Sequence, residues 1–161
     1  GENFGNRGRR SEEQIELMRA LWTQELVTFK GDWHSVTDAG LNPLPVQQPI
    51  PVWIGGYAEP VLRRIGAISD GWVFSAGDAS DEMIETIHGH ARDAGREPGE
   101  IGLDVMVGLA DGGPEHCAEV VAKWKDKGAS HASLDTMGAG LASPDDHIDA
   151  IRRLKEAIGS A

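Results

Sequence analysis

The second part of the sequence alternates between short apolar runs and amphipathic stretches, and this alternation constrains the fold more than any other feature. Each apolar run leads into a Gly- or Asp-containing turn, then into a stretch with helical spacing of apolar residues, and then into the next run. Strands that are separated by helices pair in parallel through right-handed crossovers. The pattern therefore predicts an α/β fold, as an open sheet or as a barrel, with strands at residues 52–54, 71–74, 101–110 and 129–136.

Each of the four predicted helices has a start signal and one apolar face. Pro60, Pro114 and Pro144 suit the first turn of a helix, and Ser80 and Ser143 are typical N-cap residues. The faces predicted to be buried are Val61, Leu62, Ile65 and Ile68; Met83, Ile84, Ile87 and Ala91; Cys117, Val120, Val121 and Trp124; and Ile148, Ile151, Leu154 and Ile158.

Residues 1–51 precede this repeat and have a different organisation. Ser11 to Gln14 has the form of a capping box and predicts a helix over 11–23 whose apolar face includes Ile15, Met18, Leu21 and Trp22. A hairpin follows within 26–36, and four prolines make 42–51 an extended connector. We therefore expect one domain over 1–161, with 1–51 as the leading helix, hairpin and connector and 52–161 as four βα units.

Composition excludes several classes of function. A net charge of −11 repels nucleic acid and anionic membranes, and the apolar runs are too short to span a bilayer. The single cysteine, Cys117, cannot form an internal disulfide, and the six histidines lack metal-ligand spacing, so no metal site is predicted. These features favour a cytoplasmic protein.

An ordered set of motifs resembles the luciferase-like monooxygenase family, particularly its coenzyme F420-dependent members. The motifs lie at 7–13, 21–23, 29–33, 43–47, 51–56, 63–64 and 69–72. The resemblance implies a (β/α)8 TIM barrel of which this chain is the C-terminal half, carrying strands 5–8 and lacking strands 1–4. The chain would then be an incomplete fragment of a larger enzyme.

The resemblance implies a flavin- or deazaflavin-dependent oxidoreductase that carries out hydride transfer or monooxygenation of a small organic substrate. Coenzyme F420 is the expected cofactor, with FMN as the alternative, and no catalytic residue is assigned. One competing hypothesis is a non-catalytic half-barrel that pairs with another chain. Another is a small self-sufficient α/β protein with an open sheet and no redox role.

Ligands of parallel α/β folds bind where strands end and helices begin, which selects loops 55–59, 75–80, 109–113 and 136–143. Two glycines at a strand end let backbone amides approach a phosphate, although Glu59 would repel it. Because the corresponding loop of the family contacts the cofactor phosphate, the resemblance implies a cofactor site at Gly55, Gly56, Tyr57, Ala58 and Glu59. Candidate substrate-lining residues are Ser75, Asp78, Thr136 and Gly138.

Two expectations concern charge and assembly. Arg7, Arg9 and Arg10 precede the first helix, where they pair either with a cofactor tail, with a partner chain, or simply with Glu12 and Glu13.

Because parallel strands normally bury both faces, four unclosed strands leave edges and an apolar interior exposed. We therefore expect a homo-oligomer or pairing with an N-terminal half.

Overall fold

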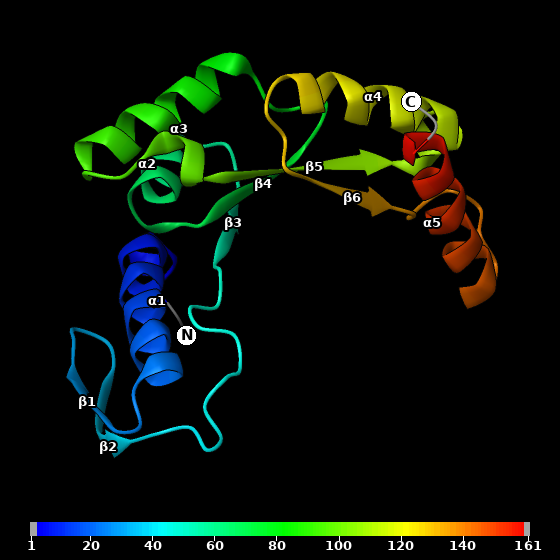
Figure 1. The fold of residues 1–161 in the computed structure, drawn as a ribbon. Coiled ribbons are helices and arrows are strands. Elements are labelled where there is room, and N and C mark those ends of the chain that lie inside the picture. The colour runs from blue at the N-terminus through cyan, green and yellow to red at the C-terminus, as the bar shows by residue number, and fades with distance from the viewer. Residues whose placement is uncertain (1–2, 160–161) are drawn as a thin grey trace.

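The computed structural model describes residues 3–159, and it contains the predicted parallel sheet (Figure 1). All neighbouring strands of this sheet are parallel and lie side by side in chain order. This confirms the α/β half-barrel that the alternating pattern and the family resemblance predicted. The strands are β3 (Trp53–Gly55), β4 (Gly71–Ser75), β5 (Gly102–Gly108) and β6 (His131–Asp135).

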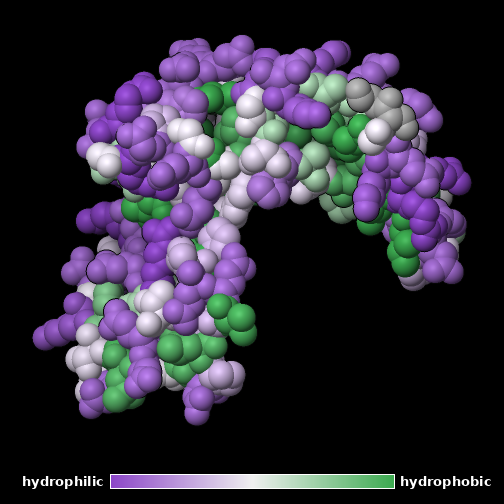
Figure 2. All heavy atoms as spheres, viewed as in Figure 1, coloured by the Kyte–Doolittle hydropathy of each residue, from purple (hydrophilic) through white to green (hydrophobic). Residues whose placement is uncertain are grey.

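Four helices connect or follow these strands and cover the outer face of the sheet, so that the chain forms an arch. The space-filling view shows the opposite side of the sheet hollowed and open (Figure 2). None of the helices within residues 3–159 is long and apolar enough to span a membrane. The helices are α2 (Glu59–Ile68), α3 (Asp81–Asp93), α4 (Gly113–Asp126) and α5 (Pro144–Gly159), with short 3-10 turns at Phe4–Asn6, Pro98–Glu100 and Leu109–Asp111.

The hydrophobic core lies between the sheet and these helices. Trp72 and Phe74 point from β4 toward the helices, with their ring centroids 4.4 Å apart, and Phe74 lies 4.7 Å from the ring of Trp124 on α4. Ile65 and Ile87 fill the space between α2 and α3 and are almost fully buried. The alternation of strand residues thus places one set in the core and the other on the hollow face.

The helix starts follow the predicted capping residues in two cases. The Met83 amide donates to the Ser80 hydroxyl at 3.3 Å, and the Asp146 amide donates to the Ser143 hydroxyl at 3.3 Å. In return, the Asp146 carboxylate accepts the Ser143 amide at 2.9 Å, and hydrogen bonding with Ser143 holds the pKa of Asp146 below its usual range. Both caps are therefore confirmed.

The predicted start of the first helix is wrong. Helix α1 (Arg7–Thr23) begins at Arg7, and the Ser11 hydroxyl donates to the Arg7 carbonyl at 2.8 Å from inside the helix. The buried residues of α1 are Ile15 and Leu17, whereas Met18 is 36% exposed. The short 3-10 turn before Arg7 supplies the first helical turn, so the Ser–x–x–Gln pattern is not used as a cap.

The prediction that all four apolar residues of the last helix point inward is also wrong. Leu154 is 6% exposed, but Ile148 and Ile151 are 51% and 54% exposed. Ile151 lines an open hollow of about 330 Å³ with Ala132 and Leu134 of the edge strand β6. Helix α5 lies at the end of the arch, so only one side of its apolar face has a neighbour (Figure 1).

The predicted hairpin is confirmed as antiparallel strands β1 (Val27–Lys30) and β2 (Ser35–Ala39). A carboxylate of α1 attaches its turn to the helix. Glu13 accepts hydrogen bonds from the backbone amides of Asp32 and His34, both at 2.6 Å, and from the Trp33 amide at 3.0 Å. The His34 ring lies 2.8 Å from the same carboxylate.

We expect this attachment to weaken in acid. Burial raises the pKa of Glu13, but the hydrogen bonds from His34 and the hairpin amides outweigh it, so the pKa is lowered overall. A lowered folded-state pKa contributes stability above the unfolded pKa, and that stability is lost as pH falls through the folded pKa. Protection of the amides of residues 32–34 from hydrogen exchange, taken relative to the intrinsic rate at each pH, should therefore fall in that acidic range, ahead of the β3–β6 sheet. Glu13→Gln should give fast exchange already at neutral pH, and an unchanged exchange pattern would contradict this role.

Candidate functional site

The predicted diglycine corner lies at the carboxyl end of β3. Gly56 has φ +127°, a conformation that favours glycine, and a Cβ there would lie 3.2 Å from Cγ1 of Val61. The Trp72 indole donates a hydrogen bond to the Gly56 carbonyl at 3.0 Å. The core therefore holds the corner through Trp72, and only glycine fits position 56 without strain.

Two predicted cofactor residues turn away from this corner. The Tyr57 hydroxyl accepts the Ser75 amide at 2.8 Å, so this side chain ties the corner to the end of β4. The Glu59 carboxylate lies 3.4 Å from Nε2 of His90 on α3. This pairing directs the acidic group toward α3, which lessens the repulsion of an anion that Glu59 would otherwise cause.

The remaining part of the corner lines a hollow between the start of α1 and the start of α2. Gly55 and Ala58 contribute to its wall, and its volume is about 710 Å³. Ala58 is the N-cap residue of α2 and makes no side-chain cap hydrogen bond. The Val61 and Leu62 amides donate to the Ala58 carbonyl at 2.7 and 3.1 Å, and Pro60 has no amide hydrogen. What the start of α2 offers the hollow is therefore mainly its positive dipole end.

The charge of this hollow is opposite to that of the whole chain. Its described lining includes four arginines and no carboxylate, whereas the chain has a net charge of −11. Such a local excess of positive charge attracts anions, and the arginine guanidinium can bind phosphate through two hydrogen bonds. We call this site the arginine hollow; its arginines are Arg7, Arg9, Arg63 and Arg64.

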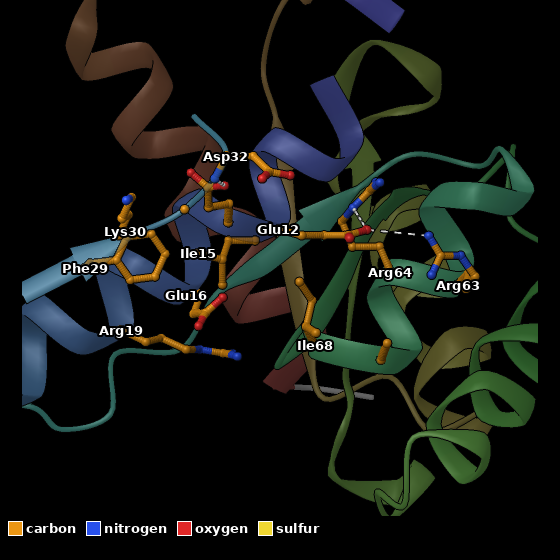
Figure 3. Close-up of a pocket in the computed structure, with 13 residues that line it drawn as sticks. Glu12, Ile15, Glu16, Arg19, Phe29, Lys30, Asp32, Arg63, Arg64 and Ile68 are labelled. Atoms are coloured by element: carbon orange, nitrogen blue, oxygen red, sulfur yellow. Dashed lines mark hydrogen bonds and ion pairs between the residues drawn. The ribbon is translucent and has the colours of Figure 1, made fainter. Parts of the chain in front are cut away.

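Two of these arginines are partly neutralised. Glu12 lies 3.0 Å from Nε of Arg64 and 3.5 Å from an Nη atom of Arg63, and Figure 3 shows both α2 side chains directed toward Glu12. These pairs adjoin a second hollow, of about 680 Å³, between α1, α2 and the hairpin. Because charges of both signs line that second hollow and pair with each other, it is a weaker candidate for binding an anion.

The other two arginines are in an unusual position for a helix. Arg7 and Arg9 lie in the first turn of α1, which contains no acidic residue, although the helix dipole disfavours positive charge there. Arg7 stacks 3.6 Å from the Phe4 ring and donates to the Phe4 carbonyl, and Arg9 lies 5.8 Å from the Trp33 ring. Their predicted pairing with Glu12 and Glu13 does not form, since those carboxylates bind Arg63, Arg64 and the hairpin.

The candidate substrate-lining residues do not form one wall. Ser75 lines a hollow of about 240 Å³ at the ends of β4 and β5, and Asp78 is exposed beyond it. Gly138 lines a separate hollow of about 660 Å³ between the loops that follow β5 and β6. Thr136 lies beside that loop, with its hydroxyl 2.7 Å from Nδ1 of His147.

Sequence reasoning did not assign Arg63 and Arg64 to the site. Arg63 is exposed and Arg64 is partly buried on α2, and apolar periodicity carries no information about either residue. The available signal was the charge: two adjacent arginines lie one turn into the helix that follows the diglycine corner, in a chain where acidic residues outnumber basic ones by 26 to 15.

Comparison with known proteins gives the family. The sequence model of luciferase-like monooxygenases matches residues 1–111. An uncharacterized protein of Mycobacterium tuberculosis is 33% identical over 133 residues, which are 81% of this chain and 43% of that protein. The FMNH2-dependent dimethylsulfone monooxygenase of Pseudomonas putida is 30% identical over 86% of this chain and 40% of that protein. The F420-dependent glucose-6-phosphate dehydrogenase of Segniliparus rotundus is 32% identical over 65% of this chain and 31% of its own length.

Solved structures share the fold. A monooxygenase from Streptomyces bottropensis has a TM-score of 0.73 at 15% identity, over 98% of this chain and 62% of that one. An F420-dependent secondary alcohol dehydrogenase has a TM-score of 0.58 at 19% identity, over 98% and 55%. This chain thus spans about half the length of its relatives, which include both F420-dependent and FMNH2-dependent enzymes. The chain belongs to the luciferase-like monooxygenase family of flavin- and F420-dependent oxidoreductases.

Proposed function

We propose that this chain forms one half of a flavin- or deazaflavin-dependent oxidoreductase barrel and that its arginine hollow binds the anionic tail of the cofactor. The observation that carries the proposal is the meeting of a helix start without a side-chain cap, Gly55 of the diglycine corner and four arginines around one hollow. Backbone amides and arginines together are the groups that bind phosphate best in proteins. When bound, the reduced cofactor supplies the hydride, while this chain positions it.

Coenzyme F420 is the cofactor we favour. Its tail carries a phosphodiester and several carboxylates, whereas FMN ends in a single phosphate. Four arginines line a hollow of about 710 Å³, and even with Glu12 paired to Arg63 and Arg64 their excess positive charge suits the larger number of negative charges. Several relatives are F420-dependent glucose-6-phosphate dehydrogenases, which supports the same choice.

A half-barrel that pairs with another chain without catalysing a reaction is the second candidate. The observation that favours it is the open inner face of the sheet, which leaves any bound cofactor exposed to water on that side (Figure 2). For the same reason we expect the chain alone to bind a cofactor without turning over substrate, because exclusion of water supports such chemistry.

Titration with F420, FMN and riboflavin, followed by flavin or deazaflavin fluorescence, tests the proposal. Riboflavin lacks the phosphate, so it should bind more weakly than FMN, and F420 should bind most tightly. Arg7→Ala should weaken F420 binding by roughly tenfold or more, because hydrogen bonds to charged groups contribute about 1.5–3 kcal/mol each. Arg92→Ala is the matched control, since Arg92 is exposed on α3 outside the hollow.

Equal binding of riboflavin and FMN, or an unchanged affinity in Arg7→Ala, would remove the arginine hollow as the anion site. Absence of binding by all three compounds, with the chain folded, would favour the non-catalytic candidate.

A further inference from the structure

Arg64 differs from the other arginines of the arginine hollow because its side chain is largely buried. The Arg64 side chain is 11% exposed, whereas that of Arg63, its neighbour on α2, is 50% exposed. Arg7 and Arg9 on α1 are exposed as well. Removing a guanidinium from water costs free energy unless polar partners replace the lost hydration. The contacts around Arg64 therefore indicate how this charge is stabilised and which way it faces.

Helix α1 supplies a partner for one edge of the guanidinium. Nε of Arg64 donates a hydrogen bond to Oε1 of Glu12 at 3.0 Å, and Figure 3 shows the two side chains meeting between α1 and α2. Within residues 3–159 the hydrogen bonding of Arg64 involves Nε and neither of the two Nη atoms. Both Nη atoms are donors, so this second edge of the guanidinium remains able to bind another acceptor.

A glycine leaves space for that second edge. Gly8 lies in the first turn of α1, and a Cβ at this position would be 2.3 Å from Nη2 of Arg64 and 3.3 Å from its Cζ. Any larger residue would therefore push the guanidinium aside. Gly8 and Arg64 both line the arginine hollow, so the Nη edge lies at the wall of the proposed anion site.

We propose that Glu12 and Gly8 are positioning residues that present the Nη edge of Arg64 to the phosphate of the cofactor. Glu12 fixes the Nε edge, and Gly8 gives the opposite end room to face the hollow. The inference rests on the proposed function and assigns Arg64 as the arginine that is already oriented before the cofactor binds. A side chain held in its binding conformation loses less entropy on binding, which raises affinity.

Glu12 has a second effect on the site, because a carboxylate beside an anion also repels it. The two effects predict opposite results for Glu12→Ala. Loss of repulsion alone would tighten F420 binding, whereas loss of orientation should weaken it roughly tenfold, as expected when a hydrogen bond to a charged group is lost. Glu12→Gln keeps an acceptor of the same length without the charge, so it should bind F420 roughly twofold more tightly or better.

Glu16→Ala is the matched control for charge. Glu16 is exposed one turn further along α1 and takes no part in the ion pairs with Arg63 and Arg64. The substitution removes the same charge from the same helix and leaves Arg64 oriented. It should therefore not weaken F420 binding, in contrast to Glu12→Ala.

Gly8→Ala gives the sharpest test because it changes no charge. The atom that must move is the flexible end of Arg64, so the cost to folding is small and alanine favours the helix. F420 affinity should fall roughly tenfold, as for loss of a hydrogen bond to a charged group, while the melting temperature stays unchanged or rises. Gly89→Ala on α3 is the control, since a Cβ there meets no atom within 4 Å. A purely structural role of the Glu12–Arg64 pair would not lower affinity at unchanged stability.

NMR of the arginine side chains measures the orientation without any cofactor. The Nε–H signal of Arg64, identified by its absence in Arg64→Lys, should be protected from exchange in this chain and in Glu12→Gln but not in Glu12→Ala. An unprotected signal in this chain, unchanged or tighter F420 binding by Glu12→Ala, or unchanged binding by Gly8→Ala would each overturn the inference and leave the arginine hollow standing. Absence of F420 binding by the unsubstituted chain would contradict the proposed function itself, and the inference with it.

Discussion

Replacing Trp72 with alanine is expected to lower the free energy of unfolding by about 3–5 kcal/mol, the usual cost of deleting a large buried aromatic side chain. Trp72 is fully buried in β4 and contacts the Phe74 ring at a centroid distance of 4.4 Å. Its indole also donates to the Gly56 carbonyl at 3.0 Å, so the substitution removes packing and a hydrogen bond together. Urea denaturation followed by circular dichroism measures the loss.

Trp72→Phe separates the two contributions. Phenylalanine keeps most of the apolar contact with Phe74 but cannot donate to Gly56, so we expect a smaller loss of stability. The Gly56 carbonyl would then lose its donor, and the corner beside the arginine hollow would be less well held. F420 affinity should therefore fall in Trp72→Phe even where the protein is folded. A loss below about 1 kcal/mol in Trp72→Ala would mean that the core is not organised around this ring.

The repeating units were predictable because their signals are local. Ser80 and Ser143 begin helices as expected, and the alternation of apolar runs and helical stretches predicted parallel strands. Their order in the sheet followed only from the resemblance to a barrel family. The start of α1 was not predictable in this way. A Ser–x–x–Gln pattern identifies a possible cap, but the 3-10 turn at Phe4–Asn6 begins the helix earlier, and Ser11 then falls inside it.

The candidate site was predictable only in its backbone. Gly55 and Gly56 could be predicted as a site because two glycines at a strand end let backbone amides approach a ligand closely. Gly56 does adopt a positive φ. The net charge of the arginine hollow depends on which arginines form ion pairs with nearby carboxylates. Glu12 pairs with Arg63 and Arg64, which lie about fifty residues further along the chain, rather than with its near neighbours Arg7 and Arg9. Ion pairs between residues so far apart in sequence cannot be predicted from a local pattern.

Apolar periodicity also shows which face of an element is apolar without showing what covers it. Ile148 and Ile151 continue the apolar stripe of α5 correctly, yet both are more than half exposed. Asp104 interrupts the apolar pattern of β5, and its position on the inner face became apparent only from the strand register. Ile151 lines a hollow with Ala132 and Leu134 on the helix side of β6, whereas Asp104 lies on the inner face of β5.

Two helical glycines are expected to respond in opposite directions to the same substitution. Gly66 of α2 lies against α3, where a Cβ would be 2.5 Å from the Ile87 carbonyl oxygen and 2.9 Å from the Ala91 amide nitrogen. Both neighbours are backbone atoms, so Gly66→Ala must push the two helices apart. Such overpacking costs about 1–3 kcal/mol, and here it exceeds the gain of up to about 1 kcal/mol that alanine brings to a helix.

Gly89 of α3 provides the matched control, because a Cβ there meets no atom within 4 Å. Gly89→Ala should raise the free energy of unfolding by about 0.5–1 kcal/mol through helix propensity alone. Measured together by urea denaturation, the two variants separate backbone crowding from propensity, since propensity predicts stabilisation in both. Stabilisation by Gly66→Ala would show that α2 and α3 do not pack at this distance. Because α2 begins at the arginine hollow, destabilisation in Gly66→Ala should be accompanied by weaker cofactor binding, whereas Gly89→Ala should bind as the parent does.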